Sequence, residues 1–327
     1  MFRGSWRSPR VSRSSLVSAG LALALSVFSA VPAGPPAARA AESVPVTINF
    51  RAVVGEQPFA CGQRYPGIGT TGATVMPSDF RLYVSELAML DAAGNATPVS
   101  LEQDGKWQFE QVALLDFEDK SGPCANGTAE TRDVVVGSVP AGSYTGIRFS
   151  LGVPFELNHQ DATIAPSPLN LTTLFWTWQG GYKFFRVDLE PDRMAMGPMG
   201  APKPEGAPAE KPHGAPSGHG AADASSGWAI HLGSTGCQAA SQMQAPAACT
   251  NPNRPTVELM PFEAGSSVVL VDLAALLAGT NVEVNQPESA FGCMSAPNDS
   301  DCAGIMGALG LPFGGAESAG QTLFRVQ

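Results

Sequence analysis

The stretch DFRLYVSELAML, residues 79–90, is decisive for the fold because it is mostly apolar, β-branched or aromatic and ends shortly before the turn residues Ala93-Gly94-Asn95. Short alternating or apolar segments of this kind are typical of β-strands. Comparable segments lie at residues 44–54, 107–117, 132–139, 143–153, 175–190, 226–235 and 256–262. Many short strands separated by turn signals predict an all-β fold, a sandwich or barrel-like single domain.

Two C-terminal segments differ from the strands. The run VLVDLAALL, Val269–Leu277, predicts one short helix. Residues 291–315, FGCMSAPNDSDCAGIMGALGLPFGG, contain a cysteine-bracketed loop followed by small residues. We expect this tail to pack on the surface near the ends of the sheets.

Residues 191–225 form a Pro/Gly/Ala-rich insert that lacks large apolar side chains and cannot build a core. We predict a flexible, disordered loop between two strands. The simplest interpretation is a tolerated low-complexity insertion. The alternative is weak copper capture by its soft and imidazole donors, which are Met194, Met196, Met199, His213 and His219.

The N-terminus has the pattern of a secretory signal peptide. Basic residues precede an apolar stretch at about residues 16–30, and Ala38-Arg39-Ala40 offers small residues for cleavage. No later segment supplies the roughly 20 apolar residues that a membrane span requires. We therefore expect a signal peptide at 1–40 and a periplasmic or secreted single domain at 41–327, the rival being an uncleaved anchor.

The charge of the chain bears on its partners. Residues 1–40 hold five arginines and no acidic residue, so the remainder has 14 basic against 29 acidic residues. Such a surface repels phosphate backbones and attracts cations or a basic partner. Nucleic-acid binding is therefore not expected.

The six cysteines indicate disulfides, because their number is even, the chain has an export signal, and no CxxC pair is present. Of the 15 possible pairings, we favour Cys61–Cys124, Cys237–Cys249 and Cys293–Cys302. The last two would each bracket a short loop rich in Pro or Asn. The first would close the longest loop and constrain the unfolded chain most.

The sequence contains none of the motifs GxSxG, HExxH, GxxxxGK[ST] or CxxCH. Outside the insert it has only two histidines, His159 and His231, and each lies near a tryptophan-bearing segment. Two imidazoles are half of a copper or zinc shell, so a further donor is needed. Alone, each histidine is an ordinary hydrogen-bonding or core-edge residue.

Trp176 and Trp178 lie two residues apart in FWTWQGGYKF, residues 175–184. In an extended strand both indoles would point to one face. The indole N–H is only a donor and cannot bind a metal. Core packing is therefore the simplest role for both side chains.

The ordered set of segments nevertheless resembles one family, the MbnP-like periplasmic copper-binding proteins, also described as the four-Cys partner of a metallo-mystery pair. The resemblance rests on collinear pieces that span nearly the whole chain after residue 40. They are PFACGQRYPGIG, DFRLYVSELAML, the LLDFED block ending at Cys124, GSYTGIRFSLGVPFELNHQD, SPLNLTTLFWTWQGGYKFFRVDL, IHLGSTGC and GCMSAPNDSDCAGIMGALGL.

This resemblance implies a mononuclear copper site with His159 and His231 as imidazole ligands. It also implies that Trp176 or Trp178 is oxidised to kynurenine, whose aryl amine can bind copper where an indole cannot. A partner dihaem cytochrome c peroxidase-like (MbnH-like) protein is expected to make that modification. The long insert at 191–225 departs from the family's shorter connection, which leaves the copper stoichiometry open.

We therefore expect an exported copper-binding protein for copper capture, storage or delivery, and not an enzyme. The first rival is a mononuclear copper oxidoreductase that uses the same ligands with an open coordination position. The second is a structural β domain, without metal, whose tryptophans only pack or stack.

Overall fold

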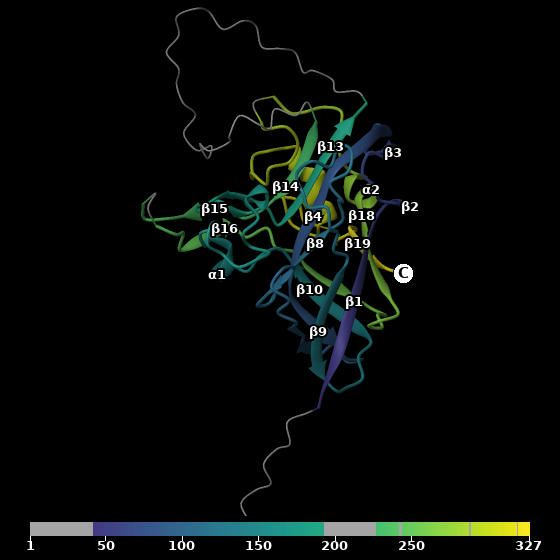
Figure 1. Ribbon diagram of the computed structural model, residues 1–327. Helices are drawn as coiled ribbons and strands as arrows, with labels where there is room; N and C mark the ends of the chain where they lie inside the picture. Colours follow the sequence, from purple (N-terminus) through teal and green to yellow (C-terminus); the bar gives the residue numbers. More distant parts are fainter. Residues whose placement is uncertain (1–41, 193–226, 242–243, 288, 319) are drawn as a thin grey trace, which may run out of the picture. The chain divides into compact units, whose positions relative to one another are not determined.

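The computed structural model of the 327-residue chain describes residues 42–192, 227–241, 244–287, 289–318 and 320–327. The predicted signal peptide and nearly all of the predicted insert lie outside these residues. Within them, two β-sheets form the framework (Figure 1).

The first sheet has the strand order β19-β18-β1-β9-β6, and β2 also pairs with β1. β1 runs antiparallel to β9 and parallel to β18. The strands are β1 (Ser43–Val54), β2 (Gln57–Pro58), β6 (Ser100–Leu101), β9 (Val134–Pro140), β18 (Val268–Asp272) and β19 (Phe324–Val326).

The second sheet is built around the long strand β4, with the order β14-β13-β4-β10-β17. Four shorter strands extend it, since β3, β5 and β8 pair with β4 and β7 pairs with β8. The strands are β3 (Tyr65–Ile68), β4 (Ala73–Leu90), β5 (Ala96–Pro98), β7 (Gln108–Phe109), β8 (Val112–Asp116), β10 (Gly146–Leu151), β13 (Phe185–Pro191), β14 (Trp228–Leu232) and β17 (Thr256–Leu259).

The two sheets share one apolar core. Phe149 of β10 touches Phe50 of β1 and Phe324 of β19 edge to face, at ring-centroid distances of 5.8 Å and 5.1 Å. Such aromatic pairs across the gap are typical of a β-sandwich interior. The predicted all-β fold is confirmed.

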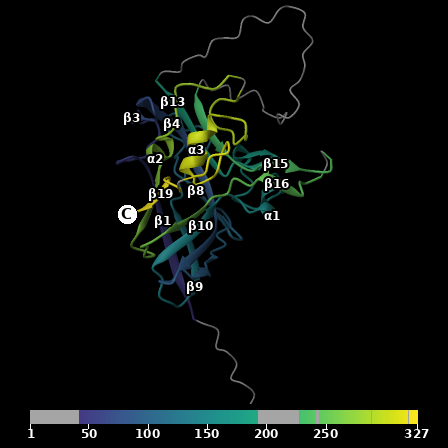
Figure 2. The ribbon, with the colours of Figure 1, turned by 180° about the vertical axis from the view of Figure 1, so that it is seen from behind.

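Two hairpins stand apart from the main sheets: β11 (Phe175–Thr177) with β12 (Gly181–Tyr182), and β15 (Thr235–Gln238) with β16 (Ala248–Asn251). Figure 1 shows the β15–β16 hairpin beside the short helix α1 (Phe155–Asn158), and the reverse view in Figure 2 agrees.

The predicted helix at Val269–Leu277 is wrong over its first half. Residues up to Asp272 continue strand β18, and helix α2 covers only Leu273–Leu277. Val269 and Val271 are β-branched and pair in parallel with β1, which favours the strand. Asp272 then caps α2, its carboxylate accepting from the backbone N–H of Ala274 at 3.0 Å.

The C-terminal tail is not a surface loop as expected. Residues 302–308 form helix α3 (Cys302–Ala308), and its Ile305 and Met306 are buried in the common core. The helix was not predicted because its two large apolar residues, Ile305 and Met306, lie among small residues that show no clear helical pattern.

The three predicted disulfides, Cys61–Cys124, Cys237–Cys249 and Cys293–Cys302, are all present. No helix among the described residues is long and apolar enough to cross a membrane.

Candidate metal centre

One face of the second sheet carries charges instead of apolar side chains. On β4, Asp79 and Arg81 alternate with Phe80 and Leu82, which are fully buried in the core. On β13, Arg186 and Asp188 alternate in the same way with Phe185 and Val187. Because successive strand residues point to opposite sides, both polar pairs share the face away from the core.

The strand register converts these pairs into a continuous ion-pair lattice. Arg186 faces Arg81, and Asp188 faces Asp79 across the β4–β13 ladder. The Asp79 carboxylate accepts from Arg81 Nε at 2.8 Å and lies 3.0 Å from Arg186 Nε. Arg186 Nε also donates to Asp188 at 2.9 Å.

His231 extends this lattice onto β14, where it faces Arg186. Its Nε2 lies 2.8 Å from Asp188 Oδ1. Burial alone would raise the pKa of Asp188, but its hydrogen bond to His231 and the adjacent Arg186 guanidinium hold that pKa below its usual range. The ionised carboxylate only accepts, so Nε2 carries the proton and Nδ1 has the free lone pair.

The backbone around His231 is fixed by the C-terminal tail. The buried Ser295 hydroxyl donates to the carbonyl of His231 at 2.9 Å and accepts from the N–H of Gly233 at 3.0 Å. Cys293 pairs with the same strand, because its carbonyl accepts from His231 N–H at 2.9 Å. The tail thus closes the free edge of β14 next to the imidazole.

A short 3-10 turn, η1 (Thr172–Leu174), covers the charged face. Thr173 accepts from Arg81 at its hydroxyl, at 3.2 Å, and from Arg186 at its carbonyl, at 3.0 Å. Lys183 donates to the same carbonyl at 3.2 Å. Since η1 runs directly into β11, these bonds anchor the tryptophan hairpin over the lattice that holds His231.

Trp176 is the extra residue of a β-bulge in that hairpin. Phe175 pairs with Tyr182 and Thr177 with Gly181, so Trp176 has no partner on β12. Bulges redirect a side chain away from the regular alternation. The half-buried Trp176 ring lies so close to Gly233 that a Cβ there would stand 2.4 Å from it.

Trp178 lies in a different environment. It is in the turn after β11 and is 41% exposed. Strand alternation therefore ends before it, and the expectation that both indoles share a strand face does not apply. The backbone of Trp178 nevertheless contacts the candidate site, because its carbonyl oxygen lies 3.1 Å from His159 Nδ1.

His159 follows α1 and is 7% exposed. The Trp178 carbonyl only accepts, so Nδ1 carries the proton and Nε2 is unprotonated. Nε2 accepts from Asn158 Nδ2 at 3.2 Å, a hydrogen bond that a bound metal would displace. The Asn158 amide is oriented by its oxygen, which accepts from Tyr182 N–H at 2.8 Å. The edge of His159 packs against the Phe155 ring.

Both imidazoles are neutral at pH 7. Burial lowers the pKa of His159, and the hydrogen bond to Trp178 only partly offsets this. Burial likewise lowers the pKa of His231 more than Asp188 raises it. Neutral imidazole is the form that binds metals, so each ring offers one unprotonated nitrogen.

The β11–β12 hairpin connects the four predicted residues. It contacts His159 through the Trp178 carbonyl and reaches the strand of His231 through the ring of Trp176. Among the described residues, two groups of three His, Cys, Asp or Glu side chains lie close enough to share a metal ion, and His231 is in neither group. His159 and His231 together therefore still need a third ligand. They fit copper only if residue 176 or 178 supplies that ligand after its indole has been modified.

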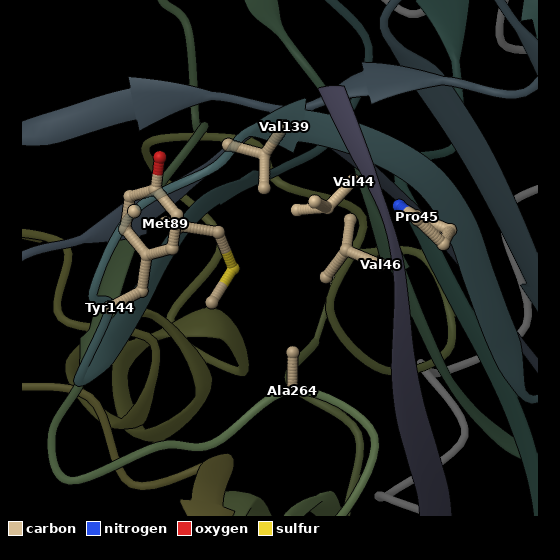
Figure 3. Close-up of a pocket in the computed structure, with 8 residues that line it drawn as sticks. Val44, Pro45, Val46, Met89, Val139, Tyr144 and Ala264 are labelled. Carbon is tan, nitrogen blue, oxygen red and sulfur yellow. The ribbon is translucent and has the colours of Figure 1, made fainter. Parts of the chain in front are cut away.

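An apolar hollow elsewhere lacks this chemistry. Figure 3 shows it lined by residues of β1, β4 and β9 and of the loops that follow β9 and β17. The residues around it offer one phenol and one thioether, but no imidazole or carboxylate. The lining residues are Val44, Pro45, Val46, Met89, Val139, Gly142, Tyr144 and Ala264.

Sequence reasoning missed the residues that position the two histidines, namely Asp188, Arg186, Thr173, Ser295 and Asn158. One signal was available. Asp79-x-Arg81 and Arg186-x-Asp188 place opposite charges two apart inside apolar strands, which indicates a charged strand face.

Comparison with known proteins agrees with this architecture. No curated protein sequence matches the chain. Among solved structures, MbnP from Methylosinus trichosporium matches with a TM-score of 0.67 and 28% identity, covering 87% of this chain and 98% of that one. The family model described as MbnP matches residues 43–295. The chain therefore belongs to the MbnP family.

Proposed function

We propose that this protein is an exported copper-binding protein of the MbnP family that captures, stores or delivers copper. Three disulfides are typical of proteins that fold in an oxidising compartment, where glutathione does not compete for copper. The acidic composition raises the local concentration of cations.

His159 Nε2 and His231 Nδ1 are the proposed imidazole donors. In each ring the opposite nitrogen is occupied by a protein acceptor, Trp178 O for His159 and Asp188 for His231. Such outer hydrogen bonds fix the tautomer and the ring orientation of metal-binding histidines. Two imidazoles with one amine accept either Cu(I) or Cu(II).

Trp176 is the proposed precursor of the third donor. The observation that carries this proposal is the bulge, which places the Trp176 ring on Gly233, two residues beyond His231. Oxidation to kynurenine breaks the indole C2–C3 bond, adds oxygen to both carbons and releases C2 as formate. The ring nitrogen becomes an aryl amine with a lone pair.

The oxidant must come from outside, and a dihaem peroxidase-like partner using peroxide is the proposed source. The exposed Trp178 ring is the better placed of the two to meet such a partner, whereas Trp176 lies deeper. Modification of Trp178 is the alternative that the experiment must distinguish.

The test is peptide mass spectrometry of protein from its native source, followed by copper titration. We expect the 175–184 peptide to be heavier by about 4 Da at residue 176. His159→Ala and His231→Ala should each weaken copper binding by at least about 100-fold. The matched control is the double variant His213→Ala, His219→Ala, which removes the two other histidines of the chain.

Unmodified tryptophan together with unchanged affinity in both single variants would contradict the proposal and leave a structural β domain. Loss of copper binding in the control variant alone would show that the copper site lies in the insert. Oxygen or peroxide turnover by the copper-loaded protein with a reductant would favour the oxidoreductase instead of the binding protein.

A further inference from the structure

The Cys237–Cys249 disulfide lies directly against the unprotonated nitrogen of His159. Cys249 Sγ is 3.4 Å from His159 Nε2, the nitrogen with the lone pair. The two sulfur atoms and a ring nitrogen of His159 all lie within 4.8 Å of one another. Reduction of the disulfide would therefore place two thiols and an imidazole around one point.

This disulfide is the one bridge of the three in which both cysteines are partly exposed, and their neighbours Gln238 and Ala248 are exposed. Cys293 and Cys302 are fully buried, and in the remaining bridge Cys61 is partly exposed while Cys124 is fully buried. Because thiol–disulfide exchange requires access to a sulfur, an external thiol should reduce this bridge first.

The hairpin keeps the two cysteines opposite each other without the sulfur bridge. Cys237 pairs with Cys249 in register, between the pairs Thr235–Asn251 and Gln238–Ala248. The Ala247 N–H donates to the Gln238 carbonyl at 2.9 Å, which adds a backbone bond at the hairpin end. Side chains opposite each other on antiparallel strands stay within contact range.

We propose that reduced Cys237 and Cys249 form, together with His159, an alternative site that binds a cuprous ion and competes with the proposed copper site for His159. Thiolates are soft ligands that select Cu(I), and imidazole also suits copper. The site uses His159 but neither His231 nor an oxidised tryptophan. It therefore goes beyond the proposed function and can exist without it.

Reduction of the Cys237–Cys249 disulfide needs two electrons and two protons, and a dithiol protein of the thioredoxin-fold class is the proposed reductant. Its two thiols give two electrons and two protons to the Cys237–Cys249 bond and become a disulfide. Copper binding then displaces the two cysteine protons to solvent. A copper-bound dithiol is protected from reoxidation as long as the metal stays in place.

The test uses the full-length His231→Ala protein, in which the proposed histidine–kynurenine site is disabled. After brief anaerobic treatment with a phosphine reductant, maleimide peptide mapping should find labels on Cys237 and Cys249 only. Cu(I) titration against a chromophoric chelator should show one additional ion per chain, bound at least 100-fold more tightly than by the untreated variant. X-ray absorption should detect sulfur ligands.

Two further variants in the same background assign the ligands. Cys237→Ser with Cys249→Ser should abolish the additional binding, and His159→Ala should weaken it at least tenfold. Equal Cu(I) binding before and after reduction would overturn the proposal, as would full binding by the double serine variant. Failure of this site in the His231→Ala protein leaves the proposed function untouched, because wild-type copper binding is measured without reductant.

Discussion

His231 and His159 have opposite surroundings. His231 lies on a strand of the main sheet, in a lattice of buried ion pairs, and its backbone is held by Ser295. His159 lies after a four-residue helix and contacts two small hairpins, one of which carries a half-exposed disulfide. One ring is fixed by the sheet register and the other by loops.

This difference suggests that the two histidines have different roles in metal binding, His231 as the rigid ligand and His159 as the adjustable one. A ligand in a rigid lattice keeps its geometry whether or not metal is present, which reduces the ordering cost of binding. A ligand on loops can adjust to a change of copper oxidation state. The hairpin of Trp176 spans the two, anchored to the lattice through Thr173 and to His159 through Trp178.

The largest expected effect comes from removing a charge of the ion-pair lattice around His231. In Asp79→Ala, Arg81 and Arg186 lose a shared partner inside the protein, which should cost about 3–5 kcal/mol of unfolding free energy. Urea unfolding measures the loss. The matched control, Glu258→Gln, removes an exposed ion pair with Arg148 and should change stability by less than about 1 kcal/mol. Equal effects would show that the lattice is not a structural centre.

Asp116 of β8 extends the lattice, because it is fully buried and faces Arg81 across the β4–β8 ladder, and it predicts how stability depends on pH. Burial, reinforced by Glu118 and Asp79 and opposed by Arg81, raises the pKa of Asp116 to about 7 from 3.8. A raised carboxyl pKa means that the folded state binds more protons than the unfolded state, so stability falls as pH rises from 3.8 to about 7.

Asp116→Asn should remove this dependence. Between pH 5 and 8 the wild type should lose about 2.5 kcal/mol relative to the variant, measured by urea unfolding at each pH. Both histidines have lowered pKa values and act in the opposite direction below 6.5, but they are present in both proteins and cancel. Parallel pH curves for the two proteins would refute the assignment.

Asp188→Asn sharpens the comparison at the imidazole itself. It keeps the size of the side chain but removes the charge that orients His231 and pairs with Arg186. Copper affinity should fall about 10–100-fold, as is common when a partner of a metal-binding histidine is changed. At the other histidine we expect a smaller change from Asn158→Asp, because the nitrogen of His159 that does not bind copper is held by the Trp178 carbonyl and not by Asn158.

The smallest expected effect concerns the contact between the two regions. In Gly233→Ala the new methyl group would meet the Trp176 ring at 2.4 Å and the Tyr182 carbonyl oxygen at 2.7 Å, so the ring and the β12 backbone must shift, at a cost of about 1–3 kcal/mol. The yield of modified residue 176 should fall in parallel, as measured by peptide mass spectrometry. Gly307→Ala in α3 is the control, since nothing lies within 4 Å of its Cβ position and alanine favours a helix. A normal yield in Gly233→Ala would mean that the contact does not place the ring.

Apolar alternation and turn residues act locally and located most of the long strands. The predicted strand at 175–190 is wrong as a single element, because it divides into β11, β12 and β13, with a turn around Gly180 between β11 and β12. Sequence reasoning also failed at Val269–Leu277, where helical spacing and β-branched residues conflict and the parallel pairing with β1 is decisive. The tail was misjudged because small residues conceal the apolar face of α3.

For the site, the sequence predicted His159, His231 and the tryptophans through a family resemblance, and their roles stay predictions. Asp188 could not be assigned to His231 because strand register is a property of the folded sheet. The separation of Trp176 from Trp178 depends on a bulge that has no marker in the sequence.

The most direct test of the central claim is X-ray diffraction at the copper absorption edge, on crystals of natively processed, copper-loaded protein. We predict one anomalous peak bonded to His159 Nε2 and His231 Nδ1, with residue 176 opened to kynurenine beside it. A copper ion that binds only one of the two histidines, or that lies away from an intact Trp176, would contradict it.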